Sequence, residues 1–105
     1  MGTGPFAVPA FDALRQAGHQ IALVVTRPMP PVKSRKGAPS APVREWAQTH
    51  GLPLVDPDSI NDEAAVAIVA EQKTDLLVVC DYGQILKNPA LEAARHGGIN
   101  LHGSL

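Results

Sequence analysis

The stretch Asp75-Leu76-Leu77-Val78-Val79-Cys80 decides the fold, together with the turn Asp81-Tyr82-Gly83-Gln84 that follows it at once. Its apolar residues form a continuous run, and such a run is typical of a parallel strand that is covered on both faces. A second continuous run, Ile21-Ala22-Leu23-Val24-Val25, lies within the expected strand at residues 20–26. Both runs therefore predict strands of one parallel sheet.

Helices and strands are expected to alternate along the rest of the chain. Glycine and proline mark most of the boundaries between them, as Pro9 and Gly18 do for the first helix. The third expected helix has Asn61, Asp62 and Glu63 as its cap and Ala65, Ile68 and Val69 as its inner stripe. This alternation predicts a doubly wound parallel α/β sheet that binds ligands at the carboxyl ends of its strands. The expected helices are residues 9–17, 43–50, 61–72 and a short one from residue 88, and the expected strands are residues 20–26, 52–55, 75–80 and 99–102.

Composition limits what the chain can be. With 105 residues, 45% of them apolar and 18% charged, it is one small globular domain. Cys80 is the only cysteine, which excludes an internal disulfide, and its apolar neighbours indicate core packing. Four dispersed histidines and one cysteine offer no metal-ligand spacing, so no metal is expected. Because it has neither a long apolar run nor a signal-peptide pattern, we expect a cytoplasmic location and no membrane contact.

Residues 27–43 are expected to form a stiff loop, because prolines at five positions exclude regular structure. The net charge of −1 gives the whole chain no attraction for nucleic acid. Between Arg27 and Arg44, however, lie five of its nine basic residues and no acidic residue. Such a patch can neutralise phosphates, although a solvated surface loop is an equally good interpretation. The five residues are Arg27, Lys33, Arg35, Lys36 and Arg44.

Asn100 and His102 are the candidate catalytic pair. Side chains two residues apart in a strand point to the same face, so the amide and the imidazole are expected to reach one spot. An amide can stabilise the oxyanion of a tetrahedral intermediate, and an imidazole can also move a proton. The alternative is that both side chains are polar residues that only form hydrogen bonds at the end of a strand and have no catalytic role.

The opening segment Gly2-Thr3-Gly4-Pro5-Phe6-Ala7 fits the dinucleotide fingerprint by letter. It lacks both a preceding strand and the acidic residue that would bind a ribose hydroxyl. Arg27, which follows the expected strand at residues 20–26, could instead favour a 2′-phosphate. A nucleotide- or NADP-binding module is therefore the alternative function.

Four segments resemble the folate-dependent formyltransferases. The string Gly98-Ile99-Asn100-Leu101-His102-Gly103-Ser104-Leu105 resembles their signature. Residues 1–9, 27–43 and 75–86 match further segments in the same order and at similar spacing. The resemblance implies a Rossmann-like fold and transfer of a formyl group from 10-formyltetrahydrofolate to the α-amine of methionyl initiator tRNA. The long basic loop favours this acceptor over the nucleotide and sugar acceptors of other members.

The resemblance also implies a role for individual residues. Asn100 would donate a hydrogen bond to the developing oxyanion, and His102 would share that task and move a proton. Basic residues of the loop would contact the acceptor stem of the tRNA. The implied folate contacts are Tyr82, Gly83, Ile85, Leu86, Ser104 and Leu105, and the implied tRNA contacts are Arg27, Lys33, Arg35 and Lys36.

The resemblance makes residues 1–105 part of a catalytic domain. A first strand, expected between the second and fourth strands of the sheet, would precede Met1, and its absence would leave a hole. The C-terminal half, with a catalytic aspartate and a tRNA-binding domain, would follow Leu105. We therefore expect the fragment alone to be inactive and the intact protein to be a monomer.

Overall fold

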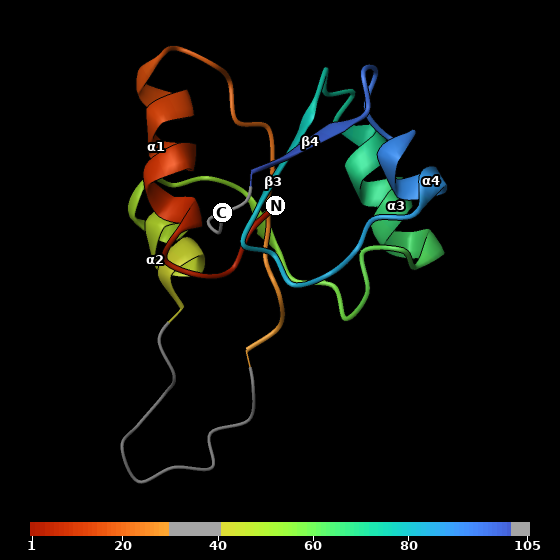
Figure 1. Ribbon diagram of the computed structural model, residues 1–105, viewed down its shortest axis with the longest axis horizontal. Coiled ribbons are helices and arrows are strands. Elements are labelled where there is room, and N and C mark those ends of the chain that lie inside the picture. Colours follow the sequence, from red (N-terminus) through yellow and green to blue (C-terminus); the bar gives the residue numbers. More distant parts are fainter. Residues whose placement is uncertain (30–40, 102–105) are drawn as a thin grey trace, which may run out of the picture.

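The computed structural model describes residues 1–29 and 41–101 (Figure 1). Helices and strands alternate as predicted, but the paired parts of the strands are shorter than expected. Only Val24 and Val25 of the expected strand 20–26 pair with a neighbour. The elements are α1 (Ala7–Gln16), β1 (Val24–Val25), α2 (Pro42–Thr49), β2 (Leu54–Val55), α3 (Glu63–Glu71), β3 (Leu77–Cys80), α4 (Asn88–Leu91) and β4 (Gly98–Leu101).

The strands form two parallel pairs, β1 with β2 and β3 with β4. Val24 lies opposite Leu54, and Val79 lies opposite Asn100. Figure 1 shows α1 and α2 on one side of the strands and α3 and α4 on the other. The predicted α/β fold class, with parallel strands covered by helices on both faces, is therefore confirmed.

The first two residues join the two pairs of strands. The Met1 amine donates to the Val78 carbonyl at 2.7 Å, and the Cys80 amide donates to the Met1 carbonyl at 2.9 Å. On the other side, the Gly2 amide donates to the Val25 carbonyl at 2.9 Å. Residues 1–2 thus lie between β1 and β3, in line with the place where the sequence puts the central strand of the sheet.

The core is divided between the two faces. On the side of α1 and α2, Phe11 and Trp46 pack with their ring centroids 6.0 Å apart, and Cys80 is fully buried among them. The core role predicted for Cys80 is confirmed, and burial raises the pKa of its thiol. The Trp46 indole donates to Asp12 at 3.1 Å, which ties α2 to α1 and is the main reason that the pKa of Asp12 is lowered.

Helix α3 covers the other face, and its inner stripe differs from the predicted one. Ala65 and Val69 are buried as expected, but Ile68 is 38% exposed. Val66 packs against the core in its place. The helix is rotated relative to the expectation, because residues 65, 66 and 69 share one face of a 3.6-residue turn just as well as residues 65, 68 and 69 do. No helix within residues 1–29 and 41–101 is long and apolar enough to cross a membrane.

The buried amine of Met1 should make stability depend on pH. Burial lowers its pKa from 8.0 to about 5. Between these values the unfolded chain binds a proton that the folded chain does not, so the free energy of unfolding should rise with pH, by about 4 kcal/mol in all. Urea unfolding of residues 1–105 at pH values from 5 to 8 measures this rise.

The control is the same chain with an acetylated Met1 amine. Acetylation removes the proton-binding group, so the rise due to this amine should vanish from the stability curve. Equal slopes for the acetylated and unmodified chains would show that the Met1 amine does not titrate from a buried position.

Candidate active site

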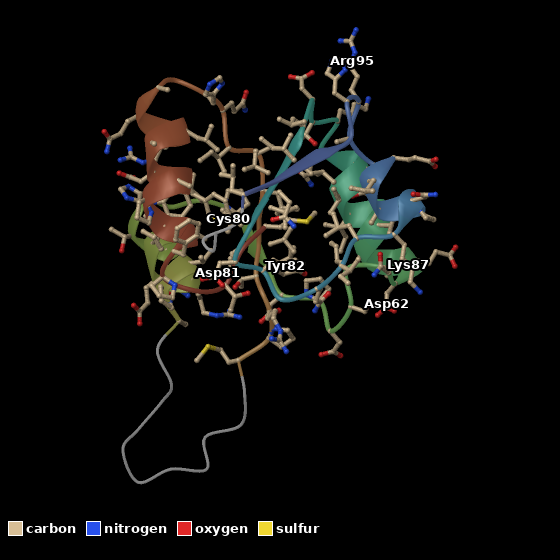
Figure 2. All side chains as sticks on the ribbon, in the orientation of Figure 1. Asp62, Cys80, Asp81, Tyr82, Lys87 and Arg95 are labelled. Atoms are coloured by element: carbon tan, nitrogen blue, oxygen red, sulfur yellow. The ribbon has the colours of Figure 1, made fainter. Side chains whose placement is uncertain are left out.

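Three segments meet at the carboxyl ends of the strands. The first segment is the loop from Asp81 to Lys87, which connects β3 to α4 and is named the β3–α4 loop. The second is Thr3, which follows residues 1–2, and the third is Arg27, which lies two residues after β1. The Thr3 hydroxyl donates to the Tyr82 carbonyl at 3.0 Å and accepts from the Arg27 amide at 3.3 Å. Figure 2 shows Asp81 and Tyr82 at the end of β3, close to the end of α1 that follows Thr3. The carboxyl edge is therefore one connected surface.

The turn at Gly4 argues against the dinucleotide alternative. The amides of Thr3 and Gly4 donate to the Asp81 carbonyl at 2.9 and 3.2 Å, so they are not available to a pyrophosphate. The Asp81 carboxylate also packs directly against Gly4, where any side chain on the glycine would collide with it. A negative group at this point would repel a phosphate. Nothing in the described residues supports the nucleotide-binding module.

Two side-chain amides hold the second half of the β3–α4 loop. Gln84 accepts from the Ile60 amide at 2.8 Å and donates to the Asp58 carbonyl at 3.0 Å. Asn61 donates to the Ile85 carbonyl and accepts from the Lys87 amide, both at 2.8 Å. Four hydrogen bonds thus fix a segment that has no regular structure of its own.

The sequence did not reveal this role of Asn61. The sequence pattern predicts Asn61, Asp62 and Glu63 as the cap of the third helix, whereas the N-cap is Asp62, which makes no side-chain capping hydrogen bond. The side chain of Asn61 turns to the loop instead, because two backbone groups there need partners. The contacts span 24 and 26 residues of sequence, and no local pattern reveals them.

The predicted folate residues in the loop differ in exposure. Tyr82 is 2% exposed and its ring belongs to the core, so only its backbone can face a ligand. Its hydroxyl has no partner among the described residues, and burial raises its pKa to about 12. Ile85, in contrast, is 86% exposed on a loop that is fixed on both sides of it. Leu86 is partly buried against the core.

Arg27 and Gly83 lie together, which the sequence did not indicate. Gly83 has φ +89°, and a Cβ on it would lie 3.0 Å from the Arg27 guanidinium. Arg44, which the sequence grouped with the basic loop, bonds Asp56 at 2.8 Å and the Arg27 carbonyl at 3.4 Å. Arg44 is therefore engaged in an ion pair, while Arg27 remains exposed beside the β3–α4 loop.

Asn100 lies in β4, which is exposed along its length and pairs with β3. Its neighbour across the ladder is Val79, two residues before the β3–α4 loop begins. The other predicted site residues lie outside the described part of the chain, and their places stay predictions. They are His102, Ser104 and Leu105, with Lys33, Arg35 and Lys36 of the basic loop. Among residues 1–29 and 41–101, no three side chains of metal-ligating type gather in one place.

Two pairs of parallel strands with helices on both faces, and with a fixed loop and the exposed strand of Asn100 at their carboxyl edge, form an α/β domain of the class whose ligands commonly bind at that edge. The family is established by direct comparison. The family model described as formyl transferase matches residues 1–105, and the chain belongs to that family.

Curated relatives share the whole length of the chain. The methionyl-tRNA formyltransferase of Rhodopirellula baltica is 65% identical to it over the full chain, which covers 32% of that protein. The methionyl-tRNA formyltransferases of Sphingopyxis alaskensis and Rhizorhabdus wittichii are 45% and 44% identical, and the chain covers 34% of each. The chain therefore spans about a third of the length of these relatives.

Replacing Asn61 tests whether it fixes the β3–α4 loop. Asn61→Ala removes two hydrogen bonds, each worth about 1 kcal/mol, and leaves the Lys87 amide without its acceptor. We expect the free energy of unfolding to fall by about 2 kcal/mol and the Lys87 amide to exchange its hydrogen at least tenfold faster. Denaturant unfolding and residue-resolved hydrogen exchange measure the two effects.

Asn88→Ala is the matched control. Asn88 is an exposed asparagine at the start of α4, and its side chain makes no hydrogen bond within the described residues. An Asn61→Ala variant whose Lys87 amide exchanges as slowly as that of Asn88→Ala would show that the loop is held by other means.

Proposed function

We propose that the chain supplies part of the catalytic domain of an enzyme that transfers a formyl group from 10-formyltetrahydrofolate to the α-amine of methionyl initiator tRNA. The observation that carries this proposal is the match of the formyl transferase family to every residue of the chain. The relatives supply the acceptor, since three of them are methionyl-tRNA formyltransferases.

The β3–α4 loop suits the ring of the formyl donor. Ile85 is 86% exposed. A ligand that covers this apolar side chain removes it from water, which stabilises the complex. Its loop is already ordered by Asn61 and Gln84, so binding costs little conformational entropy. Tyr82, Gly83 and Leu86 would complete this wall of the folate site, and Ser104 and Leu105 would begin the opposite one.

The adjacent strand would supply the chemistry. The amine of the methionyl group attacks the formyl carbon, a carbon–nitrogen bond forms, and the folate nitrogen leaves with a proton. Asn100 would donate a hydrogen bond to the oxyanion of the tetrahedral intermediate, and His102 would move the proton. Because β4 pairs with β3 in parallel, both segments leave the sheet at the same edge, which supports this division of tasks.

The basic loop would hold the tRNA. Arg27 is exposed beside Gly83, so a phosphate bound there would lie next to the proposed folate wall. Lys33, Arg35 and Lys36 would extend this positive surface along the acceptor stem, with no acidic residue between Arg27 and Arg44 to oppose it. The domain would then act on a nucleic acid in spite of its net charge of −1.

A chimeric enzyme tests the proposal. In it, residues 1–105 replace the matching third of the Rhodopirellula baltica protein, with which they share 65% identity. We expect the chimera to formylate methionyl initiator tRNA with 10-formyltetrahydrofolate. Asn100→Ala and His102→Ala should each lower kcat about 100-fold or more, with KM for both substrates changed little, because each removes an interaction made in the transition state.

Asn88→Ala and His96→Ala are the matched controls for this pair. Both residues are exposed and lie outside the proposed site, so kcat should stay within about twofold of the unaltered chimera. A folded chimera without formylation activity contradicts the proposed function. Full activity in both Asn100→Ala and His102→Ala contradicts the assigned residues.

The basic loop is tested in the same chimera. Replacing Lys33, Arg35 and Lys36 together with alanine should raise KM for the tRNA and leave KM for the formyl donor unchanged. The slope of log KM for tRNA against log salt concentration should fall by about 2 to 3, because three phosphate contacts are lost. Formylation assays at several salt concentrations measure both quantities.

The control for the loop replaces the exposed Lys73 and Arg95, which lie outside it, with alanine. If the loop variant and this control have the same salt slope, net charge accounts for the effect and residues 33–36 do not bind tRNA.

A further inference from the structure

Three elements meet beside Arg27 at the carboxyl edge. Parallel pairing of β1 and β2 directs both strands to this edge, where Arg27 lies two residues after β1 and Asp56 follows β2 directly. Helix α2 begins here, and Arg44 is its third residue. One guanidinium nitrogen of Arg44, Nη2, donates to the Asp56 carboxylate at 2.8 Å and to the Arg27 carbonyl at 3.4 Å. The side chain of Arg44 thus joins all three elements.

The position of Arg44 is unfavourable for its own helix. The first turn of a helix is the positive end of the helix dipole, where a cation is destabilising. The Arg44 side chain is 20% exposed, and its Nε is buried without a hydrogen-bond partner among the described residues. The ion pair with Asp56 compensates a guanidinium that is partly removed from water. The arrangement therefore keeps a charged donor against the Arg27 carbonyl at a cost to α2.

The backbone of Arg27 is held at both of its polar groups. Its amide donates to the Thr3 hydroxyl at 3.3 Å, and its carbonyl accepts from Arg44. Its exposed side chain lies against Gly83, where a Cβ would be 3.0 Å from the Arg27 Nη1. An arginine whose backbone is fixed before binding loses less conformational entropy when it binds a phosphate.

We propose that Arg44 is a positioning residue for tRNA binding: held by Asp56, it fixes the backbone of Arg27, whose guanidinium then binds a phosphate of the tRNA beside Gly83. Arg44 does not contact the tRNA itself, because its Nη2 already donates to Asp56 and Arg27. The inference rests on the proposed function, in which Arg27 is a tRNA contact. It gives an acidic residue, Asp56, a favourable role in binding a nucleic acid.

The sign of the effect of Asp56 distinguishes positioning from general electrostatics. An exposed carboxylate near a phosphate-binding site repels phosphates, so its removal alone should strengthen binding. If Asp56 acts by holding Arg44, its removal should weaken binding instead. Because the two effects have opposite signs, a single substitution separates them.

The test uses the chimera in which residues 1–105 replace the matching third of the Rhodopirellula baltica protein. Arg44→Ala and Asp56→Ala should each raise KM for the tRNA about fivefold, because the Arg27 backbone is no longer fixed before binding. The kcat and the KM for the formyl donor should stay within about twofold, because neither residue contacts the donor or the reacting groups. Formylation assays measure all three quantities.

Glu45→Ala is the matched control for Asp56→Ala. Glu45 is another exposed acidic residue, next to Arg44 in the chain, and its side chain makes no hydrogen bond within the described residues. Its removal takes away the same charge, so KM for the tRNA should stay equal or fall. A KM for the tRNA in Asp56→Ala that also stays equal or falls would overturn the proposal, since Asp56 would then act only through its charge.

A double-mutant cycle with Arg27→Ala tests whether the effect passes through Arg27. In a chimera that already carries Arg27→Ala, Arg44→Ala and Asp56→Ala should change KM for the tRNA by less than about 1.5-fold, because the residue that they position is gone. A rise as large as in the chimera with Arg27 intact would show that Arg44 binds the tRNA directly, and it would overturn the proposal.

Hydrogen exchange separates the failure of this proposal from the failure of the proposed function. Relative to Glu45→Ala, Asp56→Ala should speed exchange at the Arg27 amide about tenfold or more, whether or not the chimera formylates tRNA. Unchanged exchange at this amide overturns the positioning role and leaves formyl transfer unaffected. Faster exchange in a folded chimera that does not formylate tRNA contradicts the proposed function, while Arg44 still fixes the backbone of Arg27.

Discussion

The pairing of residues 1–2 with both β1 and β3 is the constraint on which the rest of the structure depends. Each two-stranded pair is too small to be stable alone, and the hydrogen bonds of Met1 and Gly2 join them across the middle. The same bonds align the carboxyl ends of the strands. Thr3 then lies between Arg27 and Tyr82 and bonds the backbone of both, which makes one edge of three segments.

The candidate site at this edge is both rigid and exposed. Asp81 adopts φ +52°, where an aspartate is uncommon, and its carbonyl accepts two amides from the turn after the central residues. Beyond it, the Gln84 side chain bonds the backbone of Asp58 and Ile60, and Asn61 bonds the backbone of Ile85 and Lys87. An exposed apolar side chain on a fixed loop is a feature of ligand sites, since the surface is formed before the ligand arrives.

The order of elements could be predicted from the sequence because it depends on local signals. Prolines and glycines mark the ends of α1 and α2 within two residues, and continuous apolar runs identify β1 and β3. The lengths of the strands could not be predicted, since pairing depends on a neighbour and residues 20–23 pair with none in the described part of the chain. Ile68 was misplaced because two helical stripes fit the same pattern of apolar residues.

The candidate site was predictable to a different degree. Family motifs pointed to the β3–α4 loop and to Asn100, and the parallel pairing of β3 and β4 directs both segments toward the same edge of the sheet. The contacts that shape the site are long-range: Asn61 reaches Lys87 across 26 residues, and Thr3 reaches Tyr82 across 79. Such contacts produce no periodic pattern in a single sequence. They follow only from the packing of the completed sheet.

Residue-resolved hydrogen exchange of the chain is the most direct test of the central claim that residues 1–2 join the two pairs of strands. The Gly2 amide donates to Val25 of β1, and the Cys80 amide donates to Met1. The account predicts that both amides are protected as strongly as the Leu77 amide, which donates to the Gly97 carbonyl next to β4. Fast exchange at Gly2 and Cys80 beside a protected Leu77 would show that the two halves are not joined through Met1 and Gly2.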